Sequence, residues 1–177
     1  MSDPAPNDVD PVRFRTLMAR WATGVAVVTA RLGETDAGLT VNGLLSVSLR
    51  PPSLLVSLTH DADTLPVLAR SRSFAASFLA AEQRSLSERF ARTIPSPEKF
   101  AGVPVHRGRT GAALLDGSLG AVECRVVSTT PAFDHDLVLG EVVAVELGPD
   151  RSPLIFQHSG YAETEADGRV RLPPPRH

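Results

Sequence analysis

The sequence predicts a mainly β fold, in which an antiparallel barrel carries a few helices. Three observations support this prediction. First, the 177 residues, 42% hydrophobic and 21% charged, suit one globular domain with its own core. Second, about seven short segments have the composition or alternation of strands, whereas only two or three have helical spacing. Third, strands and helices do not alternate regularly, which argues against a doubly wound parallel sheet.

The domain is expected to begin with a helix over residues 11–22. Asp10 is a suitable capping residue, and a proline follows it at the first helical position. Apolar residues then recur at helical spacing, namely Phe14, Leu17, Met18 and Trp21. Residues 1–10 and 164–177 offer little to a core, so we expect flexible tails on either side of a domain over 11–163.

Strands are expected in the next part of the chain. The β-branched segment 25–29, turn residues at 33–36 and an extended segment at 38–41 indicate a hairpin. Two more strands are predicted at 46–49 and 54–59. In the second of these strands one face is wholly aliphatic, formed by Leu54, Val56 and Leu58.

The second half of the chain mixes helices and strands. Asp63 can cap a brief helix over 65–70, a strand follows at 74–79, and 81–92 has helical spacing. Prolines and glycines in 93–115 predict a loop. The remaining expected elements are a helical turn at 98–100 and strands at 119–128, 136–147 and 153–158.

Charge and hydropathy exclude several classes of partner. Eighteen basic and twenty acidic residues give a formal charge of −2, without the basic excess of a nucleic-acid binder. No apolar run reaches the roughly 20 residues of a membrane span, and Met1–Asp10 lacks the pattern of a signal peptide. We therefore expect a soluble, cytoplasmic protein that contacts neither nucleic acid nor membrane.

Small polar side chains cluster near residue 40. Period-two alternation places Thr40 and Asn42 on one face, and Ser46 and Ser48 on one face of the next strand. Such hydroxyl and amide groups suit a polar ligand that carries a phosphate or a carbonyl edge. The alternative interpretation is a solvated strand face followed by a turn, and the pattern alone favours this alternative.

Two further groups of residues could carry chemistry. Asp134 and Asp136 flank His135, so the carboxylates could raise the pKa of the imidazole and orient it, although a plain turn is the simpler interpretation. No second cluster with metal-ligand spacing accompanies them, so no metal site is predicted. Cys124, the single cysteine, alternates in phase with valines and is expected to be inert packing.

The ordered string of motifs resembles the short-chain flavin reductases over roughly residues 13–162. The resemblance begins with Trp21-Ala22-Thr23-Gly24-Val25, Gly38-Leu39-Thr40-Val41-Asn42 and Ser46-Val47-Ser48-Leu49-x-Pro51-Pro52. It continues with Arg89-Phe90-Ala91, Lys99-Phe100-Ala101-Gly102-Val103, Asp134-His135-x-Leu137 and Gly160-Tyr161. Each motif alone is weak, whereas their order and spacing together are specific.

This resemblance implies an FMN-binding split barrel of the antiparallel Greek-key type, usually a homodimer. It implies an NAD(P)H-dependent flavin reductase that transfers hydride from NADH or NADPH to FMN or FAD. It also implies a flavin-dependent monooxygenase component as a partner that receives the reduced flavin. The sequence leaves open the choice of flavin, the choice of nicotinamide, and whether the flavin is held tightly or diffuses as a substrate.

The resemblance also implies residue roles. His135, beside Asp134, matches the histidine that contacts nicotinamide, and is the catalytic candidate. The expected cofactor-binding residues are Thr40, Val41, Asn42, Ser46, Val47, Ser48, Ser57, Thr59, Arg89, Phe90, Ala91, Asp134 and Tyr161.

Departures from the family pattern keep other functions open. Val41 stands where a small residue is typical, Leu45 where a hydroxyl is typical, and Phe133 where a glycine is typical. One alternative is therefore a flavin-binding split-barrel protein without reductase activity, or one that uses bound flavin for another redox reaction. A third hypothesis is a dimeric barrel that serves as a structural or interaction partner.

Overall fold

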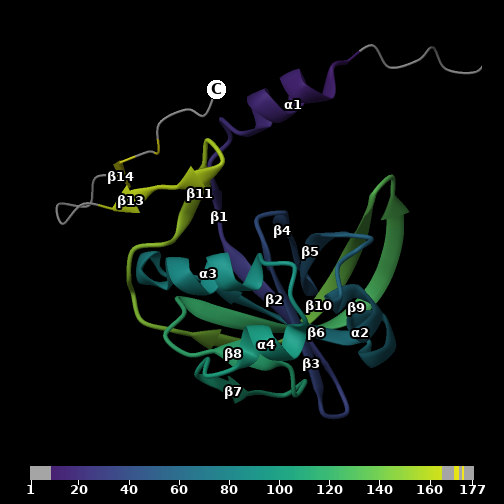
Figure 1. Ribbon diagram of the computed structural model, residues 1–177. Helices are drawn as coiled ribbons and strands as arrows, with labels where there is room; N and C mark the ends of the chain where they lie inside the picture. The colour runs from purple at the N-terminus through teal and green to yellow at the C-terminus, as the bar shows by residue number, and fades with distance from the viewer. Residues whose placement is uncertain (1–8, 165–169, 172, 174–177) are drawn as a thin grey trace, which may run out of the picture.

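The structure is a computed structural model that describes residues 9–164, 170, 171 and 173. Strands dominate the chain, and three of the helices pack against β2 and β3 (Figure 1). The helices are α1 (Pro11–Met18), α2 (Thr64–Ser71), the 3-10 turn η1 (Ala81–Gln83), α3 (Arg84–Phe90) and α4 (Ser96–Phe100). The longer strands are β2 (Ala26–Leu32), β3 (Thr35–Val41), β4 (Leu44–Leu49), β5 (Pro52–Thr59), β6 (Ser73–Phe78), β9 (Gly120–Ala132) and β10 (His135–Leu147). The shorter strands are β1 (Thr23–Gly24), β7 (Val105–Arg107), β8 (Ala113–Leu115), β11 (Ile155–Gln157), β12 (Gly160–Tyr161), β13 (Glu163–Thr164) and β14 (Val170–Arg171).

The longer strands form one antiparallel sheet in the order β3-β2-β6-β9-β10-β5-β4. Its two outermost strands, β3 and β4, are consecutive in the chain and are separated only by Asn42 and Gly43. The sheet must therefore curl until its edges approach each other, and the Ser57 N–H donates to the Gly43 carbonyl at 2.9 Å near this seam. This arrangement confirms the predicted mainly β, antiparallel split barrel.

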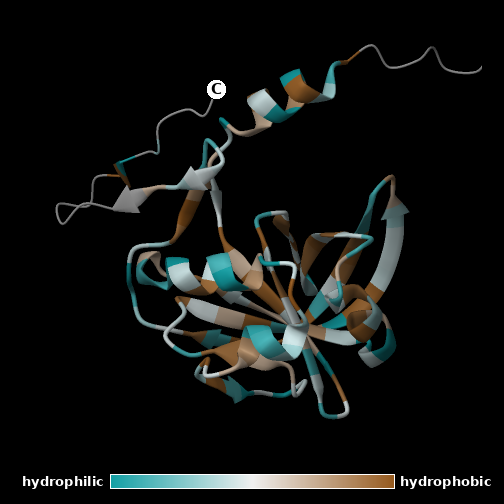
Figure 2. Cartoon of the chain, viewed as in Figure 1, coloured by the Kyte–Doolittle hydropathy of each residue, from teal (hydrophilic) through white to brown (hydrophobic). Residues whose placement is uncertain are grey.

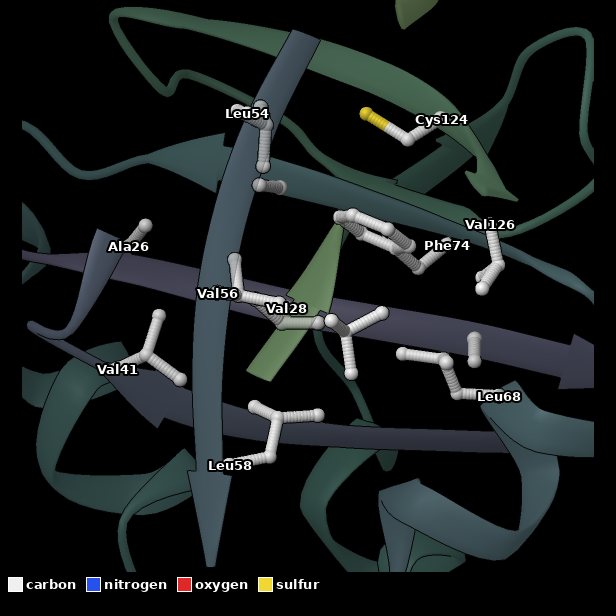
Figure 3. Packing of buried hydrophobic residues seen from close by; sticks show 13 residues of the cluster. Ala26, Val28, Val41, Leu54, Val56, Leu58, Leu68, Phe74, Cys124 and Val126 are labelled. Carbon is white, nitrogen blue, oxygen red and sulfur yellow. The ribbon is translucent and has the colours of Figure 1, made fainter. Parts of the chain in front are cut away.

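The interior of the curled sheet is filled by aliphatic side chains around Phe74 (Figure 3). The predicted aliphatic face of β5 is buried, with Leu54, Val56 and Leu58 at most 5% exposed. Cys124 also lies in this core, and burial raises the pKa of its thiol to about 12. Cys124 is therefore unreactive packing, as predicted.

A second core cluster lies between the sheet and α3 and α4. Phe90 is fully buried, and its ring meets Phe100 edge to face at 5.0 Å. Gly38 permits this contact, because a Cβ there would lie 3.0 Å from both rings. Figure 2 shows hydrophilic residues on α3 and α4 and hydrophobic segments along the strands beneath. These two helices are thereby fixed beside the end of β3.

Several boundaries differ from the prediction. The first helix ends at Met18 instead of residue 22, because the fold buries none of its side chains. The predicted helix over 81–92 is η1 followed by α3. In the predicted loop over 93–115, α4 confirms the helical turn expected at 98–100, whereas β7 and β8 were not predicted. β7 and β8 have only three residues each and pair across a loop, so neither has a local sequence signal.

The hairpin of β9 and β10 is longer than predicted. Each strand has 13 residues, and a two-residue turn, Phe133-Asp134, joins them. The register shifts twice, between Leu139 and Gly140 and between Val142 and Ala144, and such shifts bend a strand pair. One end of the hairpin therefore lies in the barrel while the other extends beyond it (Figure 1).

Most of the predicted tails lies outside the described residues. In the described part of these tails, Val9 and Asp10 are exposed ahead of α1, and β13 pairs with β14. None of the helices that the structure describes is long and apolar enough to cross a membrane. Among the same residues, no group of three or more His, Cys, Asp or Glu side chains is arranged to hold a metal ion.

His106, on β7, lies between two carboxylates. Its Nδ1 is 2.6 Å from Asp116 Oδ1, and its Nε2 is 2.8 Å from Glu146 Oε2. The hydrogen bond with Asp116, and then the one with Glu146, raises the pKa of His106 above its ordinary value of 6.5. The protonated imidazole thus links β7 to β10.

We expect this link to make stability depend on pH. A raised pKa in the folded protein stabilises it fully below about pH 6.5, and this stabilisation is lost as the pH rises through the raised pKa. Since the side chain is 43% exposed, the contribution should stay below about 1 kcal/mol. Denaturant unfolding of wild type and His106→Gln from about pH 6 to about pH 9 should show a difference that shrinks with pH. A difference that stays constant over this range would contradict the assignment.

Candidate functional site

A cleft of about 590 Å³ opens where β3 and β5 end beside the loop that follows α3. Its volume is within the range of small-molecule sites. Its walls comprise Leu39, Thr40, Thr59, Asp61, Ala62, Asp63, Phe90, Ala91, Arg92, Thr93, Ile94, Pro95 and Lys99. Four of the predicted site residues, Thr40, Thr59, Phe90 and Ala91, are thus brought together from three elements that are distant in the sequence.

Thr40 connects the cleft wall to α3. Its hydroxyl donates to the Ser87 carbonyl at 2.7 Å, and the Ser87 hydroxyl lies 2.8 Å from the Tyr161 hydroxyl. The Arg84 guanidinium stacks over the Tyr161 ring at 5.2 Å. Tyr161, a predicted site residue, therefore contacts α3 and is not part of the wall of the main cleft.

Lys99 places a buried cation in the wall of the cleft. Its side chain is 5% exposed, and its Nζ donates to the Gly38 carbonyl at 3.1 Å and lies 3.6 Å from Asp63 Oδ1. The Ser96 hydroxyl donates to the other Asp63 oxygen at 2.7 Å. Sequence reasoning gave Lys99 no charge-bearing role in the site. The available signal was that Lys99 is the only lysine in the chain.

The turn between β9 and β10 is fixed at the mouth of this cleft. The register of β10 and β5 pairs His135 directly with Thr59. The main-chain N–H of His60 donates to the Asp134 carbonyl at 3.1 Å. The Nδ1 of His135 lies 2.8 Å from Asp134 Oδ1, which orients the imidazole. The predicted pair Asp134 and His135 therefore lies beside the cleft without forming its inner wall.

The mouth of the cleft is negatively charged. A hydrogen bond from Thr59 lowers the pKa of Asp61, and the nearby His135 and His60 lower it further. The hydrogen bond with His135 also lowers the pKa of Asp134. Both carboxylates are thus ionised at neutral pH near the imidazole of His135. Sequence analysis missed Asp61, although an acidic residue just after a strand end is a common site position.

The remaining residues of the 40–42 segment face other cavities. Val41 and Asn42 line a groove of about 300 Å³ beside β1 and β2. Asn42 also lines an adjoining groove of about 430 Å³, together with Ser57. The prediction that Thr40 and Asn42 share one face is wrong, because Thr40 lines the main cleft and Asn42 lines the two other grooves. β3 ends at Val41, so strand alternation does not extend to Asn42.

The predicted residues of β4 lie away from the main cleft. Ser46 and Val47 are exposed on this outermost strand, and Ser48 is half-buried. The Ser48 hydroxyl accepts from the Arg50 main-chain N–H at 3.0 Å. The register with β5 shifts between Ser46 and Ser48, which interrupts the alternation that predicted a shared face for these two serines.

Arg89 is engaged within the protein. Its guanidinium donates to the Glu98 carbonyl at 2.8 Å and to the Ala101 carbonyl at 2.6 Å, so it ties α3 to α4. It lines a neighbouring cavity of about 430 Å³. Arg92 lines both this cavity and the main cleft. Arg92 is therefore the arginine best placed to meet an anionic ligand, although the sequence pointed to Arg89.

Comparisons with known proteins agree with this fold. Residues 18–165 match the model of the flavin reductase like domain. The chain is 37% identical over 148 residues to the reductase component of 4-hydroxyphenylacetate 3-monooxygenase from Thermus thermophilus, with 84% of this chain and 93% of that protein covered. It is 39% identical over 154 residues to the actinorhodin polyketide dimerase of Streptomyces coelicolor, with 86% of each chain covered.

A solved structure shows the same fold. The NADH:FAD oxidoreductase of Streptomyces globisporus superposes with a TM-score of 0.82 at 32% identity, over 97% of this chain and all of that chain. The matching domain model covers most of the chain, and it includes the strands, α3 and the turn that form the cleft. The ordered motifs, the split barrel and these similarities lead to one conclusion: the chain belongs to the flavin reductase like domain family.

Proposed function

We propose that this protein is an NAD(P)H-dependent flavin reductase that transfers hydride from NADH or NADPH to FMN or FAD. The main supporting observation is that the cleft of about 590 Å³ meets the Asp134-His135 turn at its mouth. One ligand can thus lie in the cleft while a second approaches beside the imidazole. When bound, the flavin ring accepts the hydride, which is chemistry that no side chain supplies.

The groups that line the cleft fit a flavin. Hydroxyls of Thr40 and Thr59 offer neutral hydrogen bonds, and the exposed segment 91–93 offers a main-chain edge. The Arg92 guanidinium suits a phosphate, because it can donate two parallel hydrogen bonds. No nucleophile is required, since these residues need only hold two rings in contact.

The finer assignment of residues remains part of this proposal. Thr40 borders the flavin ring, and Thr59 lies beside it at the end of β5. Val41, Asn42 and Ser57 line the other grooves, so their part in binding the flavin depends on the family resemblance. Phe90 and Ala91 approach the phosphate end, and the position of Arg89 beside them supports a role in holding that loop. For Ser46, Val47, Ser48 and Tyr161 the assignment depends on the family resemblance.

His135 is proposed to contact the nicotinamide. Its Nδ1 is held by Asp134, so Nε2 is the ring nitrogen directed away from that carboxylate. The carboxylate of Asp61, whose pKa is lowered chiefly by the hydrogen bond from Thr59, stands close to this imidazole. The proposed role of this part of the chain is to orient the hydride donor.

A turnover assay tests the function directly. Purified protein with added FMN or FAD should accelerate the oxidation of NADH or NADPH, followed as the loss of reduced-nicotinamide absorbance. Each flavin is tested with each nicotinamide, so the same assay shows whether the protein uses FMN or FAD and whether it uses NADH or NADPH. No acceleration in any of the four pairs would reject the proposal.

A second candidate function has support from one of the relatives. The similarity to a polyketide dimerase indicates that the domain occurs in proteins named for other reactions. In that case the protein would bind flavin and use it for another redox reaction. A protein that retains yellow flavin during gel filtration, but is not bleached by NADH or NADPH without oxygen, would support this alternative.

A homodimer is part of the proposal because no part of the chain that the structure describes buries α1. None of its residues is buried, and an isolated helix of eight residues is marginal in water. An apolar stripe formed by Phe14, Leu17, Met18 and Trp21 is exposed. The helix projects from the barrel (Figure 1), and Met18 and Trp21 line a groove together with Leu44 and Leu45. A second copy of the chain would cover both surfaces.

We expect Leu17→Asp to weaken this dimer. Wild type should sediment at twice the chain mass of 18.8 kDa, whereas the variant should shift towards the monomer because a buried carboxylate is costly. Thr16→Asp is the matched control, since this residue lies on the opposite face of α1. Sedimentation measures both variants. An equal shift for both, or a monomeric wild type, would contradict the assignment of this stripe to the interface.

A monooxygenase partner and a cytoplasmic location complete the proposal. The similarity to a reductase component of a two-component monooxygenase supports a partner that consumes reduced flavin. The reaction also needs a supply of reduced nicotinamide, which supports a location in the cytoplasm. Fractionation of cells and a coupled assay with a flavin-dependent monooxygenase test these two points separately.

A further inference from the structure

The turn at the tip of the β9–β10 hairpin contains a residue in an unfavourable conformation. Ala132 pairs with His135, so Phe133 and Asp134 form a two-residue turn. Of these two, only Phe133 has a positive φ, at 59°. This is the pattern of a type II′ turn, whose first central position favours glycine. A bulky side chain at positive φ is strained, and such strain is often found at functional sites.

The Phe133 side chain is also fully exposed, with a relative exposed area of 102%. Hairpin tips usually carry small or polar residues, which are compatible with both the turn and the solvent. Here neither the backbone nor packing within the described chain favours phenylalanine. An interaction with another molecule would account for both features.

The position of the turn indicates which molecule that is. The His60 N–H donates to the Asp134 carbonyl at 3.1 Å, so the residue after Phe133 is anchored to the end of β5. On the other side of Asp134, His135 pairs with Thr59, which lines the main cleft. The exposed ring is therefore held at the mouth of the cleft, next to the proposed nicotinamide contact.

We propose that Phe133 is a binding residue for the nicotinamide dinucleotide, and that its ring packs on one of the two planar rings of that ligand. This inference rests on the proposed function. Aromatic rings attract one another in stacked or edge-to-face geometry, and the dinucleotide offers nicotinamide at one end and adenine at the other. The aromatic side chain at a position suited to glycine thus extends the binding surface beyond His135.

Three variants separate the ring from the backbone. Phe133→Gly removes the ring and relieves the turn, Phe133→Ala removes the ring and keeps the strain, and Phe133→Tyr keeps both. The probe is tetrahydro-NAD, a non-reducing analogue, titrated calorimetrically into flavin-loaded protein. We expect affinity about two- to tenfold weaker for the glycine and alanine variants, and unchanged for the tyrosine variant. Flavin affinity should be unchanged in all three.

Stability and a shorter ligand provide the controls. Phe133→Gly should melt about 2–4 °C above Phe133→Ala, which shows that the turn itself is intact in both. Titration with the corresponding mononucleotide, which lacks adenine, identifies the ring that Phe133 contacts. The glycine and alanine variants should bind this mononucleotide more weakly than the wild type only if Phe133 packs on nicotinamide.

Three results would overturn the inference. These are unchanged analogue affinity in the glycine and alanine variants, an equal loss of flavin affinity, and a change in sedimentation without a change in analogue affinity. The last result would place the ring at a contact between subunits. If the wild-type protein bound no flavin, the proposed function itself would be overturned. The flavin titration of the wild type is therefore carried out before any variant is compared.

Discussion

Replacing His135 with alanine is expected to lower kcat/KM for NADH about tenfold or more, while the flavin dissociation constant changes little. The imidazole is fixed by Asp134 at 2.8 Å and stands opposite Thr59 at the mouth of the cleft. Loss of one hydrogen-bonding group costs about 1–3 kcal/mol, and small misplacement of the reacting rings adds to this cost. Steady-state kinetics with varied NADH, together with a flavin titration, measures both quantities.

The neighbouring imidazole provides the control for this variant. The Nε2 of His60 lies 3.7 Å from Asp136 Oδ1, and only its main-chain N–H anchors the turn. His60→Ala retains that N–H, so it should affect kcat/KM much less than His135→Ala. Equal losses of NADH use and flavin affinity in His135→Ala would show that the imidazole supports the whole cleft instead of orienting the nicotinamide.

Truncating Phe74 to alanine is expected to reduce the free energy of unfolding by about 3–5 kcal/mol. The ring is fully buried at the centre of the barrel core and stands opposite Cys124 in the pairing of β6 with β9 (Figure 3). Gly140 lies so close that a Cβ there would be 2.7 Å from the ring. The neighbouring strands therefore fit the ring tightly, and an alanine would leave a cavity between them.

Chemical and thermal unfolding test this expectation. The midpoint temperature should fall by about 6–20 °C, at about 2–4 °C for each kcal/mol in a domain of this size. Val127→Ala is the comparison, because this valine lies on β9 but is 52% exposed, and its loss should cost at most about 0.5 kcal/mol. Similar losses in the two variants would mean that the interior is not packed around Phe74.

The sequence predicted the barrel well where burial and local pattern coincide. In β5, period-two alternation identified Leu54, Val56 and Leu58, and all three are buried. In α1, the apolar spacing predicted a helix to residue 22, yet the helix ends at Met18. None of the described residues buries the apolar positions of α1, so packing does not fix its length and spacing alone could not locate its end.

The cleft was less predictable because its parts are distant in the sequence. The family resemblance, and not periodicity, identified Thr40, Thr59, Phe90 and Ala91 as neighbours. The charges of the cleft are carried by Asp61, Asp63, Arg92 and Lys99, none of which was predicted to line it. Their placement depends on the register of β5 with β10 and on the packing of α4 against β3, which no local pattern specifies.

The β9–β10 hairpin contains a part that opens only when the whole domain unfolds and a part that can open locally. Its strands carry Cys124, Val126 and Val138 in the core, so we expect the amide hydrogens of these residues to exchange only when the whole domain opens. Towards the turn, residues 127–131 are exposed, and fraying there breaks few apolar contacts. This part of β9 can thus open and reclose within the lifetime of one folded molecule, while β10 keeps His135 paired with Thr59 of β5.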